Sequence, residues 1–272
     1  MVRRFALLFA VLLLVASAVG AQTRARKVET RNAASVSAPR AAVPGGAATF
    51  AAVPFAPGEV LSYDIDWNNY GAAAHLDLSV AERGKFFGRD GLHLTADVKT
   101  VGLVRSLFAA VDSHSDSYVD PRTVLPFRTV RESSWNGRSD SATVTFDRAK
   151  NTATAASGPI DIGPETGDAL GIIYRLRALP LKDGDSMTLD GVEGNKRMQV
   201  RASVEGRERV TTRAGEFNAI RVACVPLRDG QPDEGRRFVM FYSDDKARLP
   251  VLITATPQIG TIRVALTGVK AG

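Results

Sequence analysis

The chain has 272 residues, with 35 Lys and Arg against 29 Asp and Glu, and a formal net charge of +6. Two arginines near the start and a surplus of four basic residues in 22–56 account for all of that charge, so residues 57–272 are neutral overall. A neutral domain lacks the basic face that nucleic-acid binding requires, so we expect no nucleic-acid partner. Because Cys224 is the one cysteine, no internal disulfide can form, and the fold must depend on a hydrophobic core.

The first 21 residues predict a secretory signal peptide. Arg3 and Arg4 precede an apolar run over residues 5–16, and Ala21 ends a small-residue cleavage motif, so that Gln22 begins the mature chain. The alternative is an uncleaved anchor, but the apolar run is short against the roughly 20 residues that a membrane span needs. We therefore expect export to the periplasm, with no integral membrane segment after signal cleavage.

The rest of the chain divides into a linker and one domain. Residues 22–56 are rich in Ala, Arg, Ser, Thr and Pro and show no hydrophobic period, which predicts a disordered linker. From residue 57 onward a regular pattern begins, and we expect a single antiparallel β-domain over 57–270.

A period of two runs through most of this domain. Apolar and polar side chains alternate in six stretches, at 74–80, 92–98, 142–146, 198–204, 220–224 and 262–266. Such alternation predicts strands with one buried and one solvent-facing side. Polar or Gly-containing segments between the strands predict hairpin turns, at 83–85, 89–91, 136–137, 205–207 and 244–245. One-sided strands joined by hairpins form antiparallel sheets.

Two segments have helical spacing instead. Apolar residues recur at helical intervals in 103–111 and in 168–179, where Asp168 is a candidate N-cap and Pro180 ends the helix. The fold class that follows is mainly β: one large curved antiparallel sheet, half-barrel or barrel-like, with two short helices that cover its apolar face or plug its mouth. A curved sheet of this size encloses volume that can hold a ligand.

The strand R-F-V-M-F-Y-S, residues 237–243, is apolar on both faces. Phe238, Met240 and Tyr242 alternate with Val239 and Phe241. This pattern is typical of a central strand covered on both sides, and we favour that interpretation over the alternative, the lining of an apolar pocket.

The stretch D-S-H-S-D-S, residues 112–117, is the nearest approach to a chemical site. In an extended strand Asp112, His114 and Asp116 share one side, about 7 Å apart at alternate positions. A metal site would need a further ligand from another strand, so we favour a solvent-exposed strand face and predict no metal and no cofactor. His75 and His93 also read as exposed strand residues.

The sequence does not indicate catalysis. Cys224 shares a face with Ile220 and Val222, which is typical of a core cysteine rather than a nucleophile. The G-x-S-x-G, S-x-x-K and H-E-x-x-H motifs are absent. We expect a protein that is not an enzyme, with no catalytic residue.

Five stretches in order resemble the exported proteins of the domain-of-unknown-function family 3108. They are F-A-P-G-E-V-L-S-Y-D-I-D-W (55–67), V-D-P-R-T-V-L-P (119–126), D-A-L-G-I-I-Y-R-L-R (168–177), R-A-G-E-F-N-A-I-R-V (213–222) and S-D-D-K-A-R-L-P-V (243–251). The resemblance spans roughly residues 55–268 and implies a β-rich exported protein. By analogy of fold it extends to the half-barrels of the periplasmic lipoprotein carriers LolA and LolB.

We expect a non-catalytic periplasmic binding protein that holds a lipid or other apolar ligand in a groove of the curved sheet. Apolar surface on both predicted helices and on both faces of strand 237–243 motivates this expectation. The candidate ligand-binding residues are Leu107, Phe108, Ile173, Phe238, Met240 and Phe241. The alternative is a cell-envelope scaffold or assembly factor that binds a protein partner through a sheet edge. A third hypothesis, a hydrolase of envelope polymers, requires Asp112, His114 and Asp116 to converge in a cleft.

Overall fold

The computed structural model describes residues 49–68, 70–257 and 260–272. The expected signal peptide, 1–21, and most of the expected linker lie outside the described residues. Phe50 and Val53 pack against the core, and Phe55 is buried in it. The packed part of the chain therefore begins before residue 57, within the range that the composition assigns to a linker.

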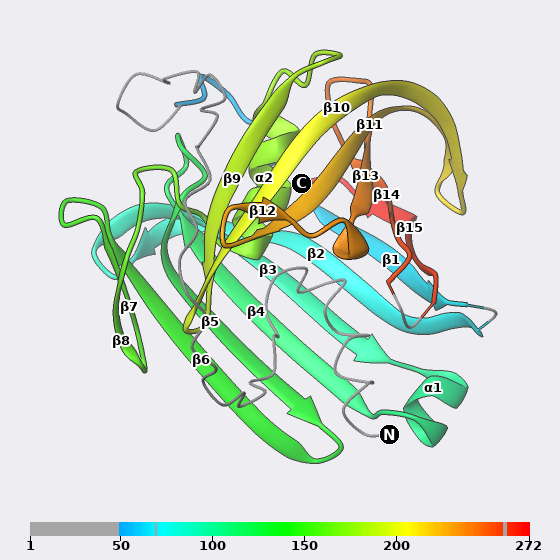
Figure 1. Ribbon diagram of the computed structural model, residues 1–272, viewed down its shortest axis with the longest axis horizontal. Helices are drawn as coiled ribbons and strands as arrows, with labels where there is room; N and C mark the ends of the chain where they lie inside the picture. Colours follow the sequence, from blue (N-terminus) through cyan, green and yellow to red (C-terminus); the bar gives the residue numbers. More distant parts are fainter. Residues whose placement is uncertain (1–48, 69, 258–259) are drawn as a thin grey trace, which may run out of the picture.

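Fifteen strands form one antiparallel sheet in the described part of the chain (Figure 1). In chain order they are β1 (Val60–Trp67), β2 (Tyr70–Phe86), β3 (Arg89–Thr100), β4 (Val111–Val119), β5 (Pro126–Trp135), β6 (Arg138–Asp147), β7 (Thr152–Ala155), β8 (Gly158–Asp161), β9 (Ser186–Glu193), β10 (Lys196–Thr212), β11 (Gly215–Arg228), β12 (Gln231–Pro232), β13 (Phe238–Ser243), β14 (Pro250–Ala255) and β15 (Ile262–Lys270). The helices are α1 (Gly102–Leu107), α2 (Ala169–Ala178) and the 3-10 turn η3 (Glu234–Arg236).

The sheet order is β8-β7-β6-β5-β4-β3-β2-β1-β15-β14-β13-β11-β10-β9, with β12 paired to β11. The first and last strands thus pair with each other in the middle of the sheet, Leu61 opposite Val269 and Val264 opposite Ile65. Bulges in β1, β2 and β10 add twist, which helps the sheet to curl on itself. This confirms the predicted curved antiparallel sheet with few helices.

The two edge strands, β8 and β9, are not joined by a ladder of backbone hydrogen bonds, so the sheet is not a closed barrel. Side chains bridge the gap in the described structure: Val192 of β9 packs with Val144 and Phe146 of β6. An ion pair joins Arg131 of β5 to Glu193 at the end of β9, with 3.3 Å between Nη1 and Oε1. The edge strand β9 therefore lies against the inner face of β5 and β6.

Two of the predicted turns are confirmed and three are wrong. The chain does turn at Asn136-Gly137, where both residues have positive φ as a tight hairpin requires, and between β13 and β14 at 244–245. Residues 83–85 and 89–91 instead pair with one another as strand ends, and the turn between them is Phe87-Gly88. The ends of β2 and β3 extend beyond the core into solvent. Residues 83–85 and 89–91 are therefore polar or Gly, as in a turn.

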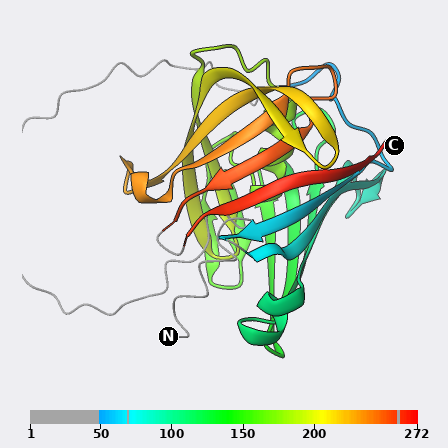
Figure 2. The same cartoon turned by 90° about the vertical axis from the view of Figure 1, so that its right-hand side faces the viewer.

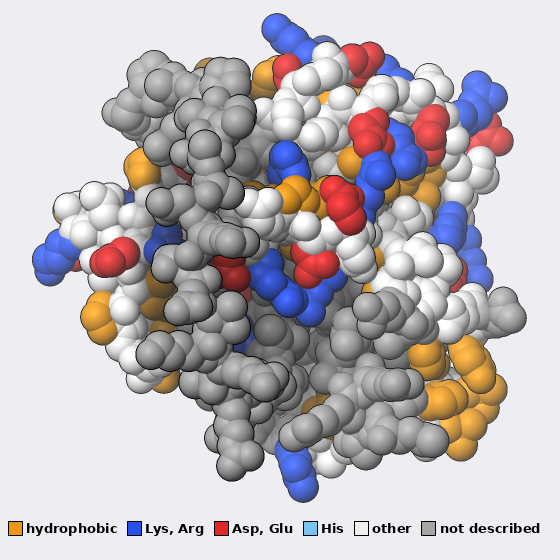
Figure 3. Space-filling view, viewed as in Figure 1, with side chains coloured by type: hydrophobic (Ala, Val, Ile, Leu, Met, Phe, Trp, Pro, Cys, Tyr) orange, Lys and Arg blue, Asp and Glu red, His pale blue; other side chains and the backbone are white. Residues whose placement is uncertain are grey.

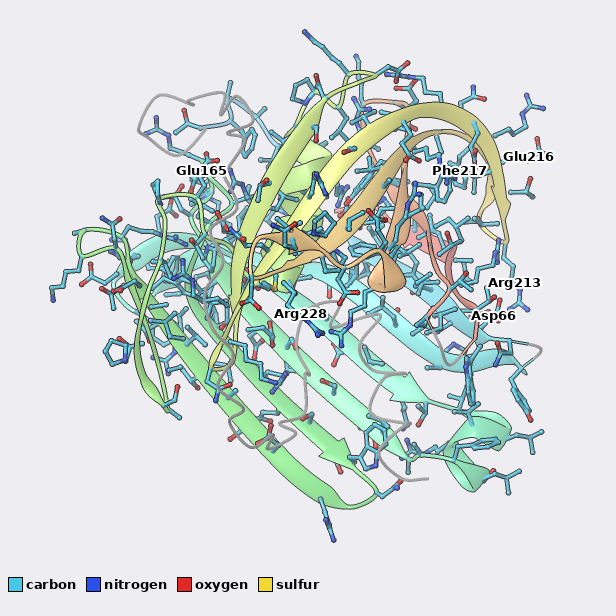
Figure 4. The ribbon with its side chains drawn as sticks, in the orientation of Figure 1. Asp66, Glu165, Arg213, Glu216, Phe217 and Arg228 are labelled. Carbon is cyan, nitrogen blue, oxygen red and sulfur yellow. The ribbon has the colours of Figure 1, made fainter. Side chains whose placement is uncertain are left out.

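The third wrong turn, at 205–207, is a bulge inside β10. Gly206 has a φ of +130°, which side chains rarely adopt, and the register shifts between Val204 and Gly206. Beyond this bulge the hairpin of β10 and β11 arches over the outer side of β1 and β15 (Figure 2). Its tip is held by an ion pair of Arg213 with Asp64 and by a hydrogen bond from Ala214 N to Leu266 O of 3.3 Å. Figure 4 shows Arg213 at this tip.

The two helices occupy different places. Helix α2 lies within the curl of the sheet, in contact with β3, β4 and β9, as expected for a helix that covers the apolar face (Figure 1). Helix α1 lies at the rim, between β3 and β4, and buries only Val104. The core is consequently formed by the inner face of the sheet together with α2.

Candidate functional site

Helix α2 is attached at its N-terminus to the edge of the sheet. Asp168 is buried and caps the helix, its carboxylate accepting a hydrogen bond from Gly171 N at 3.1 Å, which confirms the predicted N-cap. The residue before it, Gly167, bridges to β9 through hydrogen bonds from its N to Asp190 O (2.8 Å) and from Val192 N to its O (3.0 Å). The start of α2 is thus positioned by β9.

The C-terminal end of α2 is held by a buried ion pair. The side chain of Arg177 is fully buried and donates two hydrogen bonds to Glu59, at 2.6 and 2.9 Å. It also donates to the carbonyl oxygens of Pro54 (3.2 Å) and Ala247 (3.1 Å), and the Phe55 ring lies against it. Because a buried charge is tolerated only when it is well partnered, this network keeps the end of the helix in place.

Beneath the N-terminal half of α2 lies an apolar cavity of about 50 Å³. Helix α2 contributes Ala169, Ile172, Ile173 and Leu176 to its walls. The sheet contributes, among others, Leu76, Leu78, Leu189, Met198, Val200, Cys224, Phe238, Met240 and Ile253. Ile172 and Ile173 are only half-buried, so this part of the helix is packed less completely than its C-terminal end.

A second cavity of about 50 Å³ adjoins the first. The two share Leu78, Ala169 and Ile173 as walls, but the second is more polar than the first. Its polar lining residues are Ser115, Asp116, Thr129, Arg131, Asp168 and Glu193. Asp168 is 4% exposed, and the side chains of Glu193 and Arg131 are 14% and 18% exposed. The interior therefore has an apolar end and a charged end, with the start of α2 between them.

The two carboxyl groups of the charged end resist ionisation. Burial raises the pKa of Asp168 to about 6. Burial also raises the pKa of Glu193 to about 7, against the opposing attraction of Arg131, and the negative charge of Asp168 adds to the rise. Around neutral pH these groups thus exchange protons with little cost.

The structure brings together three of the six residues predicted to bind a ligand. Ile173, Phe238 and Met240 meet around the apolar cavity. Phe241, the next residue on β13, points to the other side of the sheet, with the Arg221 guanidinium 5.5 Å from its ring centre. Strand 237–243 is therefore covered on both faces, as favoured from its sequence.

The other two predicted ligand-binding residues lie at the rim. Leu107, on α1, is 69% exposed. Phe108 packs edge-on against Trp67 and Tyr70, with ring centres 5.6 and 5.8 Å away. Neither lines the interior cavities, because α1 extends outward from the sheet end rather than folding into the curl.

The D-S-H-S-D-S stretch forms strand β4, and its alternate residues do share one face, away from α2. His114 Nδ1 lies 2.7 Å from Asp97 Oδ1, and His114 Nε2 lies 3.1 Å from Asp116 Oδ1. Asp116 also contacts His93 Nε2 at 2.7 Å, and the His93 ring stacks on Tyr118. These contacts form a continuous chain of hydrogen-bonded carboxylates and imidazoles across β3 and β4.

The protonation of His114 follows from this chain. Burial disfavours its charged form, but the hydrogen bonds and negative charges of Asp97 and Asp116 outweigh burial and raise its pKa above the ordinary value. The third residue of the motif, Asp112, pairs with Arg105 at 2.9 Å, which lowers the pKa of its carboxyl group. In the described part of the chain no group of three or more His, Cys, Asp or Glu side chains has the geometry of a metal site.

A polar groove of about 780 Å³ crosses β2 to β6 beside this chain. Its charged lining residues are His75, Asp77, Asp97, Lys99, Asp112, His114, Glu132 and Asp140, and serines of β4 to β6 complete it. The groove is wide and solvated, and its carboxylates outnumber its cations. Cys224, in contrast, is buried in the core, and burial raises the pKa of its thiol to about 12.

The sequence did not indicate Arg131, Glu193 or Arg177 as interior groups. Glu193 ends β9 at a hairpin, where charged residues are normally solvated, and Arg131 lies in the middle of β5 in a largely polar stretch; both become interior because β9 returns to β5. Arg177 does carry a local signal, since it falls within a helix whose neighbouring residues are apolar.

The fold and interior define a class: a β-protein with one strongly curled, barrel-like antiparallel sheet around a single inner helix. The chain belongs to the family described as "Protein of unknown function (DUF3108)", whose model matches residues 62–267. The resemblance seen in the five sequence stretches is thereby confirmed. No curated protein matches the chain.

The chain is similar to several solved structures. A β-barrel-like protein of the domain-of-unknown-function family DUF1849 from Brucella abortus has a TM-score of 0.55 at 11% identity, covering 81% of this chain and 100% of its own. A Bacteroides fragilis protein described as exported, with a YmcC-like fold, has a TM-score of 0.34 at 12% identity, covering 82% and 99%. A Parabacteroides distasonis protein described as a lipoprotein has a TM-score of 0.32 at 10% identity, with the same coverage. At these identities the first likeness shows the fold alone.

Among the described residues, no helix has the length and apolar character that a membrane span requires.

Proposed function

We propose that this protein is a non-catalytic periplasmic binding protein that holds one apolar chain, such as the acyl chain of a lipid, between α2 and the curved sheet. The observation that carries the proposal is the apolar cavity beneath the N-terminal half of α2. Two of its walls are methionines, Met198 and Met240, whose flexible side chains adapt to ligands of different shape. The predicted signal peptide supports the location.

Entry of a chain requires a movement of the helix. A cavity of about 50 Å³ compares with about 30 Å³ for a single water molecule, so an acyl chain needs more space. The part of α2 around Ile172 and Ile173 is suited to move, because these two residues are half-buried and lie between the attachment of Gly167 to β9 and that of Arg177 to Glu59. This movement must break several contacts. One of them is the 3.2 Å hydrogen bond from the Tyr242 hydroxyl to Ile173 O.

The surroundings of His114 and Cys224, the two side chains considered for catalysis, favour a binding role over catalysis. The imidazole of His114 is engaged by two carboxylates on an open face of the sheet, and the thiol of Cys224 is buried. Neither lies beside the interior charged end. A nucleophile beside a general base, the usual arrangement for covalent catalysis, is not formed by these groups.

The test is native mass spectrometry of the full chain exported with its own leader and recovered without detergent. We expect a reproducible added mass that organic solvent extracts as lipid. The variant Val200→Phe, which fills the cavity from β10, should lose that mass, whereas Val269→Phe at a 47% exposed position should keep it. A bare chain mass in wild type would reject the proposal.

A second candidate function, an envelope scaffold that binds a protein partner, is favoured by the surface of α1. Leu103 and Leu107 are 60% and 69% exposed, and Figure 3 shows hydrophobic side chains gathered where α1 lies. Isolated exposed apolar residues are ordinary, but adjacent ones on a protruding helix suit a contact surface. Site-specific photo-crosslinking from position 107 in cells should then yield one discrete adduct, with position 87, exposed at the other end of the sheet, as control.

A further inference from the structure

The two interior cavities adjoin each other. They share Leu78, Ala169 and Ile173 as walls, so a chain that extends from the apolar cavity past these residues would end beside Asp168 and Glu193. The ligand's head group must therefore be compatible with the charged end. This inference rests on the proposed function and specifies the chemistry of its ligand.

Hydrogen-bond acceptors predominate at the charged end. Asp168 and Glu193 supply two carboxylates, and Asp116 lies in the same lining. Arg131, the one cation among the described lining residues, divides its terminal nitrogens between Glu193 (3.3 Å) and Asp140 (3.4 Å). The positive N-terminal end of α2 is already capped by Asp168. A carboxylate or phosphate head would therefore meet acidic groups, and the described lining residues offer it no cation outside an existing ion pair.

One donor at the same place has no partner. Arg131 Nε is buried and makes no hydrogen bond within the described residues. A ligand group that accepts from this nitrogen and donates to a carboxylate would satisfy both sides. An ammonium head can donate but cannot accept, whereas a hydroxyl does both.

We propose that the charged end recognises a hydroxyl head group, so that the ligand is a neutral amphiphile with one apolar chain and an alcohol head. The hydroxyl donates to Glu193 or Asp168 and accepts from Arg131 Nε. The apolar chain occupies the cavity lined by Ile173, Met198 and Met240. A neutral head group also avoids placing a further charge beside Asp168, Glu193 and Arg131.

The experiment is displacement of a neutral fluorescent probe, N-phenyl-1-naphthylamine, from the mature full chain by three ligands of equal chain length: decanol, decylamine and decanoate. At pH 7.5 we expect decanol to displace the probe at about tenfold lower concentration than either charged ligand, since a buried polar group left unpaired weakens binding by about that factor. In Glu193→Gln, decanoate should displace the probe at a lower concentration than in wild type. The displacing concentrations of decanoate and decanol should then differ by about threefold or less. Glu216→Gln, at a 64% exposed carboxylate on the hairpin tip seen in Figure 4, is the matched control and should leave the order unchanged.

The outcomes separate the two proposals. Equal displacement by decanoate or decylamine in wild type, or an unchanged gap in Glu193→Gln, overturns the hydroxyl head while leaving apolar-chain binding intact. Absence of probe binding and of decanol binding overturns both. If Glu193→Gln does not fold, Asp168→Asn replaces it, because Asn also serves as an N-cap while its charge is removed.

Discussion

At the scale of single residues, Arg177 shows what a buried charge requires. Its guanidinium has two hydrogen bonds to Glu59 and two to backbone carbonyls, and these link α2 to the segment before β1 and to the loop before β14. Desolvating the two charges costs free energy that their attraction largely offsets. The pair therefore fixes the position of the helix rather than adding net stability. Residues that contact it, such as Phe55, belong to the same anchor.

Removing one member of this pair should be costly. In Arg177→Met the carboxylate of Glu59 stays buried without a partner, and we expect the free energy of unfolding to fall by about 3–5 kcal/mol. The double variant Arg177→Met/Glu59→Leu should recover most of that loss. Urea denaturation followed by circular dichroism measures both. A double variant no more stable than the single one would contradict the anchor described here.

The interior carboxyl groups give stability a pH dependence. The pKa values of Asp168 and Glu193 in the folded state, about 6 and about 7, lie above the unfolded values of 3.8 and 4.5. The folded state therefore holds these protons more tightly, and the free energy of unfolding should decrease as the pH rises from about 4 to about 7. His114, whose pKa is also raised, acts in the same direction above pH 6.5.

Urea denaturation at pH 5 and pH 8 should show the lower stability at pH 8, by about 1–3 kcal/mol. Glu193→Gln should lose about half of this difference, while the matched Glu216→Gln should keep all of it. Stability that rises over this interval would show that the two carboxyl groups are not buried as described.

At the scale of elements, α2 is the part that local sequence predicts best. An Asp cap, an apolar stripe and a terminal Pro are short-range signals, and the helix indeed runs from Ala169 to Ala178 behind Asp168. The six strands β2, β3, β6, β10, β11 and β15 were equally predictable, because their apolar and polar residues alternate. The turn after β2 was not, because Phe87-Gly88 follows a solvated strand end where the hydrophobic period has already stopped.

The cap predicts how readily the helix opens. In Asp168→Ala the Gly171 N–H loses its partner, and we expect a loss of about 1 kcal/mol that falls on the N-terminal half of α2. Hydrogen exchange of the amides in 169–173 should accelerate about fivefold, with those near Arg177 little changed. Asp168→Asn should show the smaller effect of the two. Uniform acceleration along α2 would mean that the helix opens only as a whole.

At the scale of the whole molecule, function depends on contacts that no local pattern contains. The charged end exists because the sheet curls until Glu193 of β9 meets Arg131 of β5, residues that are distant in sequence and in sheet order. Likewise, Phe238 and Met240 became cavity walls whereas Leu107 became surface, although all three are apolar. Sequence could indicate which residues are apolar, but the curl decides which of them meet.

The arch of the β10–β11 hairpin depends on one bend. Gly206 has a φ of +130°, so Gly206→Val should cost about 1–3 kcal/mol through backbone strain. Thermal denaturation measures this loss, with Gly88→Asn as control, because Asn tolerates the smaller positive φ of a hairpin turn. Equal stability of Gly206→Val and wild type would mean that the hairpin bends elsewhere.

Cys224, the one cysteine, lies in the wall of the apolar cavity beneath α2. The most direct measurement is therefore the rate at which N-ethylmaleimide labels Cys224 in the mature full chain, with and without decanol. If the N-terminal half of α2 opens to admit a chain, labelling should be faster than global unfolding, and saturating decanol should slow it about tenfold or more. Val200→Phe should remove this protection. Labelling that occurs only at the rate of global unfolding, or that decanol leaves unchanged, would contradict an apolar-chain site beneath α2.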